Sequence, residues 1–90
     1  MTKFAIGDHV VWHSSHKDKS GVVVGIVPPH TDPRSTTLSR NATFLEVQYG
    51  AKFVYGGGGA RDHESYLVIV QGKRSAKLYW PRVSLLRRAQ

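Results

Sequence analysis

A chain of 90 residues with a hydrophobic fraction of 40% can bury one small core, so we expect a single domain over residues 1–90. Its 13 lysines and arginines against 6 acidic residues give a net charge of +7 at pH 7, which favours an anionic partner unless the charge serves solubility alone. The absence of cysteine excludes a disulfide framework and a thiolate zinc site. There is no signal-peptide pattern and no apolar run near the roughly 20 residues that span a bilayer, so we expect a cytoplasmic protein with no membrane contact.

Two β-strands are predicted near the N-terminus. The first runs from Asp8 to His13 and the second from Gly21 to Val27, with a polar loop over residues 13–20 between them. Glycine within a strand indicates a bend, a bulge or the close approach of another backbone. Side chains alternate along a strand, which gives these expected faces: Val10 and Trp12 against His9, Val11 and His13 in the first, and Val22, Val24 and Ile26 against Gly21, Val23, Gly25 and Val27 in the second.

This stretch resembles the opening of small SH3-like barrels of the KOW and Tudor type. The pattern G-D-H-V-V-W (residues 7–12), a short basic loop and S-G-V-V-V-G-I (residues 20–26) is most similar to the bacterial Tudor-like domains named for a hypervirulence-associated protein. The resemblance implies a five-stranded barrel that binds nucleic acid or a protein segment, and it implies no catalysis.

The middle of the chain is predicted to hold a long polar loop, a strand and a hairpin tip. Residues 28–41 contain three prolines and many serines and threonines, which predicts an exposed loop that is either a binding loop or disordered. Alternation over Thr43–Tyr49 predicts a third strand, which Lys52–Tyr55 extends after a kink. Four glycines, Gly56–Gly59, predict a hairpin tip and lack the spacing of a phosphate-binding loop.

The C-terminal third is predicted to complete the barrel. Glu64–Gln71 is apolar on both faces, as in a central strand, and a turn at residues 71–74 leads to a returning strand, Ala76–Trp80. A 3₁₀ turn over Pro81–Val83 and a closing strand over Ser84–Arg88 follow, with a terminal helix over residues 83–88 as the alternative. The predicted fold is therefore all-β, a small five-stranded antiparallel SH3-like barrel of the Tudor or KOW type.

The basic residues suggest the working surface. Six of the 13 cations fall between Lys73 and Gln90 with no acidic residue among them, and the predicted barrel places Lys17 and Lys19 on the same rim. Cations track a phosphate backbone, and an exposed ring, Tyr79 or Tyr55, can stack on a base, whereas Trp80 can instead fill the core. We therefore expect a non-catalytic module that binds DNA or RNA without reading sequence. The expected site residues are Lys17, Lys19, Lys73, Arg74, Lys77, Tyr79, Arg82 and Arg87.

Other functions are less well supported by the sequence. His9 and His13 on one strand lie about 13 Å apart, too far to share a metal ion. Asp62-His63-Glu64 is the densest titratable cluster, but the sequence has no nucleophile elbow and no paired carboxylates at a defined spacing, so we expect no metal, no cofactor and no enzymatic activity. An aromatic cage for a methylated cation would draw on Tyr49, Tyr55, Tyr66 and Tyr79. The main alternative is an adaptor or inhibitor that binds an acidic protein, and self-association of two copies through an edge strand is a further one.

Overall fold

The computed structural model describes residues 3–14, 17–54 and 60–89. Along the chain the strands, the α-helix and the 3₁₀ segment η1 are β1 (His9–Ser14), β2 (Lys17–Val27), α1 (Ala42–Tyr49), β3 (Ala51–Val54), β4 (Ser65–Gln71), β5 (Ala76–Tyr79), η1 (Val83–Leu85) and β6 (Arg87–Arg88). The first strand, the strand over Glu64–Gln71 and the returning strand are confirmed with small changes of their ends. The second predicted strand is confirmed but begins four residues earlier, at Lys17, so the predicted polar loop over residues 13–20 is wrong for residues 17–20.

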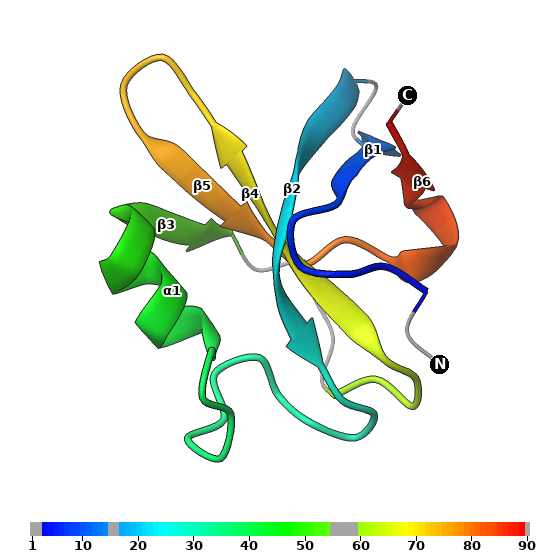
Figure 1. Cartoon of the computed structure of the whole chain (residues 1–90), viewed down its shortest axis with the longest axis vertical. Coiled ribbons are helices and arrows are strands. Elements are labelled where there is room, and N and C mark those ends of the chain that lie inside the picture. Colours follow the sequence, from blue (N-terminus) through cyan, green and yellow to red (C-terminus); the bar gives the residue numbers. More distant parts are fainter. Residues whose placement is uncertain (1–2, 15–16, 55–59, 90) are drawn as a thin grey trace.

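The strands form one open, mixed sheet rather than a closed barrel. Its order is β3-β5-β4-β2-β1-β6, with β3 parallel to β5 and every other pair antiparallel (Figure 1). The strands β3 and β6 are the two edges, and no pairing joins them in the part of the chain that the structure describes. The prediction of an all-β, five-stranded antiparallel barrel is therefore wrong: the fold is α+β, with six strands and one α-helix among the described residues.

The helix α1 occupies the segment predicted as the third strand, Thr43–Tyr49. Two caps decide this outcome. The Asn41 side chain accepts a hydrogen bond from the Phe44 N–H, and Gly50 ends the helix in the left-handed conformation (φ 61°), where its N–H donates to the Glu46 carbonyl. Leu45 is buried while Val47 and Tyr49 are exposed, which is the pattern of a helix and not of a half-buried strand.

A register shift in β2 changes the predicted faces of that strand. The pairing with β4 shifts between Val23 and Gly25, so Ile26 packs against the core on one side of the sheet although Val24 is buried in the core on the other side. The two glycines allow close approaches here. A Cβ on Gly21 would collide with the Ile69 carbonyl oxygen, and one on Gly25 would lie 3.0 Å from the Leu45 side chain. The expectation of a bulge and of close backbone approach is confirmed, and the expected grouping of Val22, Val24 and Ile26 on one face is wrong.

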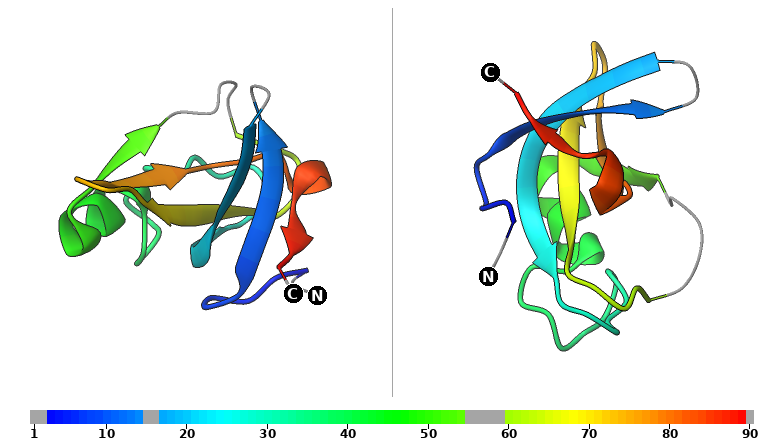
Figure 2. Two further views of the ribbon diagram at one scale, coloured as in Figure 1. Left: turned by 90° about the horizontal axis from the view of Figure 1, so that it is seen from above. Right: turned by 90° about the vertical axis from the view of Figure 1, so that its right-hand side faces the viewer.

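Each face of the sheet buries its own core. The helix-side core lies under α1 and consists of Val24, Val27, Ala42, Leu45, Ala51, Phe53, Leu67, Ala76, Leu78 and Trp80. On the other face the sheet is strongly twisted, so that β1 and β2 run across the direction of β4 and β5 in the left-hand view of Figure 2. This twist encloses the hairpin-side core, Phe4, Val10, Trp12, Val23, Tyr66, Val68 and Leu86. The expected pairing of Val10 and Trp12 on one buried face is confirmed.

The long loop over residues 28–41 has no strand or helix but packs against α1. Pro33 is buried and its carbonyl accepts a hydrogen bond from the Ala42 N–H, while the Arg40 Nε donates to the Val24 carbonyl at 3.1 Å. The predicted glycine tip, residues 56–59, and Tyr55 lie outside the described residues. The C-terminal segment forms the 3₁₀ turn η1 and the short strand β6, so the alternative of a terminal α-helix is wrong. Among the described residues no helix has the length and apolar character needed to cross a membrane.

Candidate nucleic-acid interface

A cation and an aromatic ring meet on the face of the sheet opposite α1. The Lys19 Nζ lies 4.6 Å from the centre of the Tyr79 ring, and this ring packs edge-on against Trp12 with 5.8 Å between centroids. Tyr79 is half-buried, so its ring is held from below while part of it reaches the surface. The contact joins β2 to β5 across the hairpin-side face, and it is the centre of the candidate site.

Strand register places three more lysines on this face. Lys77 precedes Leu78, which points into the helix-side core, so Lys77 points to the opposite face together with Tyr79. Lys52 pairs with Lys77 in the parallel β3–β5 ladder and shares its face, and Lys17 shares the face of Lys19 by the alternation of β2. We call this surface the basic face; it consists of Lys17, Lys19, Lys52, Lys77 and Tyr79. Lys52 was missed from the sequence because its pairing with β5 joins segments distant along the chain.

Two further predicted cations lie in the turn beside the basic face. Lys73 and Arg74 are exposed in the β4–β5 turn, which the Gly72 N–H closes by donating to the Ser75 carbonyl at 3.0 Å. The β1–β2 and β4–β5 hairpins both extend toward the top of Figure 1, and the two hairpins diverge there. The cations therefore follow one end of the sheet, from the start of β2 to the β4–β5 turn and across to β3.

The structure separates the last two predicted cations from this surface. Arg87 pairs with Val11 in the β1–β6 ladder, and Val11 points away from the face that carries Val10, Trp12 and Lys19. Arg82 is exposed beyond the end of β5 opposite the β4–β5 turn. Lys17 and Lys19 also lie within β2 and not in a loop at a barrel rim. The prediction of one surface for all eight residues is therefore wrong for Arg82 and Arg87.

The charge of the basic face is not neutralised within the described part of the chain. None of its lysines is in an ion pair there, whereas Arg34 pairs with Glu46 and Arg88 with Asp8. The six acidic side chains lie elsewhere: Asp8 by β6, Asp18 on the other side of β2, Asp32 and Glu46 by α1, and Asp62 and Glu64 before β4. The face therefore presents a field of one sign to solvent, which attracts polyanions.

Two aromatic residues considered for binding are structural. Trp80 is 1% exposed, its indole N–H donates to the Ser65 hydroxyl at 2.7 Å, and the Arg61 guanidinium stacks 3.8 Å above its ring. Tyr66 is equally buried, and its hydroxyl donates to Glu64 and accepts the backbone N–H groups of Lys3 and Phe4. Burial, and then the hydrogen bond to Glu64, raise the pKa of Tyr66. Neither ring is available to a ligand.

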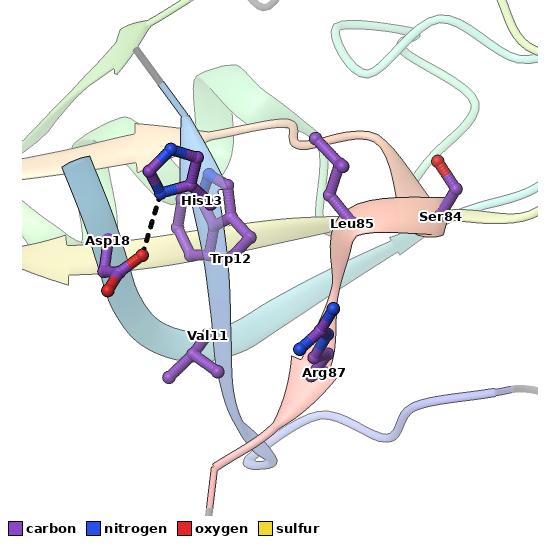
Figure 3. A pocket seen from close by; sticks show the side chains of 7 residues that line it. All are labelled: Val11, Trp12, His13, Asp18, Ser84, Leu85 and Arg87. Carbon is purple, nitrogen blue, oxygen red and sulfur yellow. Dashed lines mark hydrogen bonds and ion pairs between the residues drawn. The ribbon is translucent and has the colours of Figure 1, made fainter. Parts of the chain in front are cut away.

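A pocket of about 400 Å³ lies on the far side of the β1–β2 hairpin, between β1 and η1 (Figure 3). It exists because β6 pairs with β1 only as far as Val11, and the residues just before β6 lie off the sheet in η1. The pocket was not predictable from the sequence, since it depends on where β6 stops pairing with β1. Among the described residues no three histidine, cysteine or acidic side chains are placed to hold a metal ion. The pocket is lined by Val11, Trp12, His13, Asp18, Ser84, Leu85 and Arg87.

Comparison of the chain with protein-family models, with curated proteins and with solved structures gives no match. The resemblance to KOW and Tudor barrels therefore stays a prediction, and its implied barrel is not the fold observed.

Proposed function

We propose that the protein is a non-catalytic cytoplasmic module that binds nucleic acid through the basic face, with the β4–β5 turn extending the contact. The observation that carries this proposal is the Lys19–Tyr79 contact, with the cation 4.6 Å from the ring centre, flanked on the same face by Lys17, Lys52 and Lys77. A cationic track beside an accessible ring is the arrangement by which proteins bind a phosphate backbone and stack a base.

The mechanism is electrostatic. Lysines that contact phosphates release condensed counterions, so affinity falls as salt rises, with a slope set by the number of contacts. Tyr79 adds stacking that does not depend on base identity, which agrees with a binding face built from strands. Lys73 and Arg74, both exposed, supply further phosphate contacts when the bound nucleic acid extends over the β4–β5 turn.

The test is a salt titration of binding to short single-stranded and double-stranded DNA and RNA oligonucleotides, followed by fluorescence anisotropy. We expect log affinity to fall linearly with log salt, and Lys19→Gln and Lys77→Gln each to reduce the slope by about 0.7 on a single strand. Lys3→Gln is the matched control, because Lys3 is exposed by the start of β4, away from the basic face. Absence of binding at low salt, or equal effects of the three variants, would overturn the proposal.

An acidic protein is the alternative partner for the same charge. It would also bind in a salt-dependent way, so salt alone does not separate the two partners. The oligonucleotide titration does: a protein that binds no DNA or RNA at low salt but has an affinity for an acidic polypeptide such as polyglutamate, lost in Lys19→Gln, would favour the protein partner.

A further inference from the structure

We infer that the pocket between β1 and η1 binds a nucleoside monophosphate, either free or as the phosphorylated end of a strand held on the basic face. The inference rests on the proposed function for its ligand class, while the pocket itself is a separate site on the other side of the β1–β2 hairpin. Its volume of about 400 Å³ suits a small ligand and not a folded partner.

The pocket is rich in hydrogen-bond donors. Arg87 contributes a guanidinium that has no ion pair or hydrogen bond from its side chain to the described residues. The backbone of β1 adds another donor. The His9 carbonyl accepts a hydrogen bond from the Ala89 N–H, so the polar backbone groups of His9 face β6. Because these groups alternate in direction along a strand, the N–H of His13 faces the same side, beyond Val11, where the pairing with β6 ends. Ser84 adds a hydroxyl. A set of donors with one unopposed guanidinium favours an anion, and a phosphate matches the guanidinium in geometry.

Trp12 also lines the pocket and carries an indole N–H donor. Trp12 is 5% exposed, and its N–H has no acceptor among the described residues. No buried side-chain nitrogen or oxygen in the described part of the chain lacks a partner, so this N–H reaches solvent. It is therefore open to water or to a bound ligand.

The remaining wall suits a planar base. Val11 and Leu85 are apolar, and Leu85 is 43% exposed although it carries no polar group. The His13 ring is exposed and held by Asp18, with 2.9 Å between His13 Nδ1 and Asp18 Oδ1. In Figure 3, His13 and Asp18 lie on one side of β1, and Ser84, Leu85 and Arg87 lie on the other. A base can stack on the imidazole and donate its amino group to Asp18, while the phosphate lies at Arg87.

The test uses the two indole N–H signals in a ¹H–¹⁵N correlation spectrum, since the chain has two tryptophans. Adenosine 5′-monophosphate is the probe, with adenosine and inorganic phosphate as its two halves. We expect the monophosphate to shift the Trp12 signal saturably and the Trp80 signal little, because Trp80 is bonded to Ser65 in the core. Adenosine and phosphate are expected to bind at least about tenfold more weakly, a difference of roughly 1.4 kcal/mol.

Variants assign the site. Arg87→Gln is expected to weaken monophosphate binding at least about tenfold, whereas Arg82→Gln, a nearby exposed arginine outside the pocket, leaves it unchanged. A monophosphate that leaves the Trp12 signal in place, or equal behaviour of the two variants, overturns the inference.

Oligonucleotide binding and monophosphate binding together identify the source of the ligand and test the proposed function independently of the pocket. If a 5′-phosphorylated oligonucleotide binds more tightly than its 5′-hydroxyl form and Arg87→Gln removes the difference, the strand end is the ligand; equal binding of the two forms alongside monophosphate binding identifies the free nucleotide. If oligonucleotides bind with the Lys19 and Lys77 dependence described above but the monophosphate does not, the pocket inference fails and the proposed function stands. If the monophosphate occupies the pocket and no oligonucleotide binds, the pocket holds a free nucleotide and the proposed function fails.

Discussion

Glu46 connects three parts of the fold through one carboxylate. It accepts a hydrogen bond from the Phe53 N–H at 3.1 Å and forms an ion pair with Arg34 at 2.7 Å, so α1, the edge strand β3 and the long loop meet there. The Phe53 N–H is on the outer edge of β3, where an unpaired strand would otherwise present it to another chain. Glu46 therefore disfavours self-association of two copies through β3.

The negative charge on Glu46 stabilises the folded state at pH values above the pKa of this carboxyl. Burial raises the pKa of this carboxyl, but the hydrogen bonds from Phe53 and Arg34 and the charge of Arg34 outweigh burial and hold the pKa below its usual value of 4.5. Because the folded pKa is the lower one, this stabilisation is complete above about pH 4.5 and is lost as pH falls through the folded pKa. We expect Glu46→Gln to lower the free energy of unfolding at pH 7 by about 1.5 to 3 kcal/mol, and the difference from the wild type to shrink below pH 4.5.

Urea unfolding at pH 7 and pH 3 measures this difference. Arg34→Gln is the companion variant, since it removes the ion pair and leaves the Phe53 hydrogen bond, and it is expected to cost less than Glu46→Gln. A loss in Glu46→Gln that is the same at both pH values would contradict the role of the charge.

At the scale of elements, α1 depends on its two ends. The helix has eight residues, too few to be stable alone, and buries only Ala42 and Leu45. Replacing Asn41 by Ala removes the cap acceptor and also the hydrogen bond that the Asn41 side-chain amide donates to the Ser35 carbonyl. We expect this to lower the free energy of unfolding by about 1 to 2 kcal/mol. Asn41→Asp keeps the acceptor and should cost less.

Gly50→Val tests the other end, because a β-branched residue at φ 61° is strained, with an expected cost of about 1 to 2 kcal/mol. Gln48→Ala, at an exposed helical position, is the control for both caps and should change stability by less than about 0.5 kcal/mol. Thermal unfolding followed by circular dichroism measures all four variants. Stabilities of Asn41→Ala and Gly50→Val equal to that of Gln48→Ala would show that the caps do not hold the helix.

The strand-like alternation of this segment explains why the helix was not predicted from the sequence. Leu45, Val47 and Tyr49 alternate as in a strand and include residues that favour strands, although in the structure only Leu45 of the three is buried. Asn41 and Gly50 carried the signal for a helix of this length. The strands β1, β2, β4 and β5 were predictable because each has an apolar pattern and a local turn, whereas the parallel β3–β5 pair joins distant segments that no local pattern relates.

The candidate site was predictable to the same degree. Lys77 and Tyr79 lie on a predicted strand, and Lys19 was expected in a loop that is the first part of β2; the structure brings the three to one face. Lys52 was missed and Arg87 was misplaced because their faces follow from the pairing of the two edge strands, β3 and β6. Clustering along the sequence, which grouped Arg82 and Arg87 with Lys77, does not determine which side of a sheet a residue occupies.

At the scale of the whole molecule, the two cores share one sheet. Leu67 and Val68 are adjacent in β4 and both fully buried, yet Leu67 belongs to the helix-side core and Val68 to the hairpin-side core. Neither core can open without freeing the strand that carries the other. Each core also contains one of the two tryptophans, Trp80 in the first and Trp12 in the second.

We therefore expect both cores to unfold in a single transition. In a urea titration the folded indole N–H signals of Trp12 and Trp80 should disappear with the same midpoint. Leu67→Ala is expected to lower both midpoints together, at a cost of about 2 to 5 kcal/mol, although it empties space only in the helix-side core. Val68→Ala should likewise lower both, by less because it removes fewer carbon atoms, and Val47→Ala, 81% exposed on α1, should move neither. Separate midpoints for the two tryptophans, with each variant affecting only its own core, would show instead that the hairpin-side core opens independently of the core under α1.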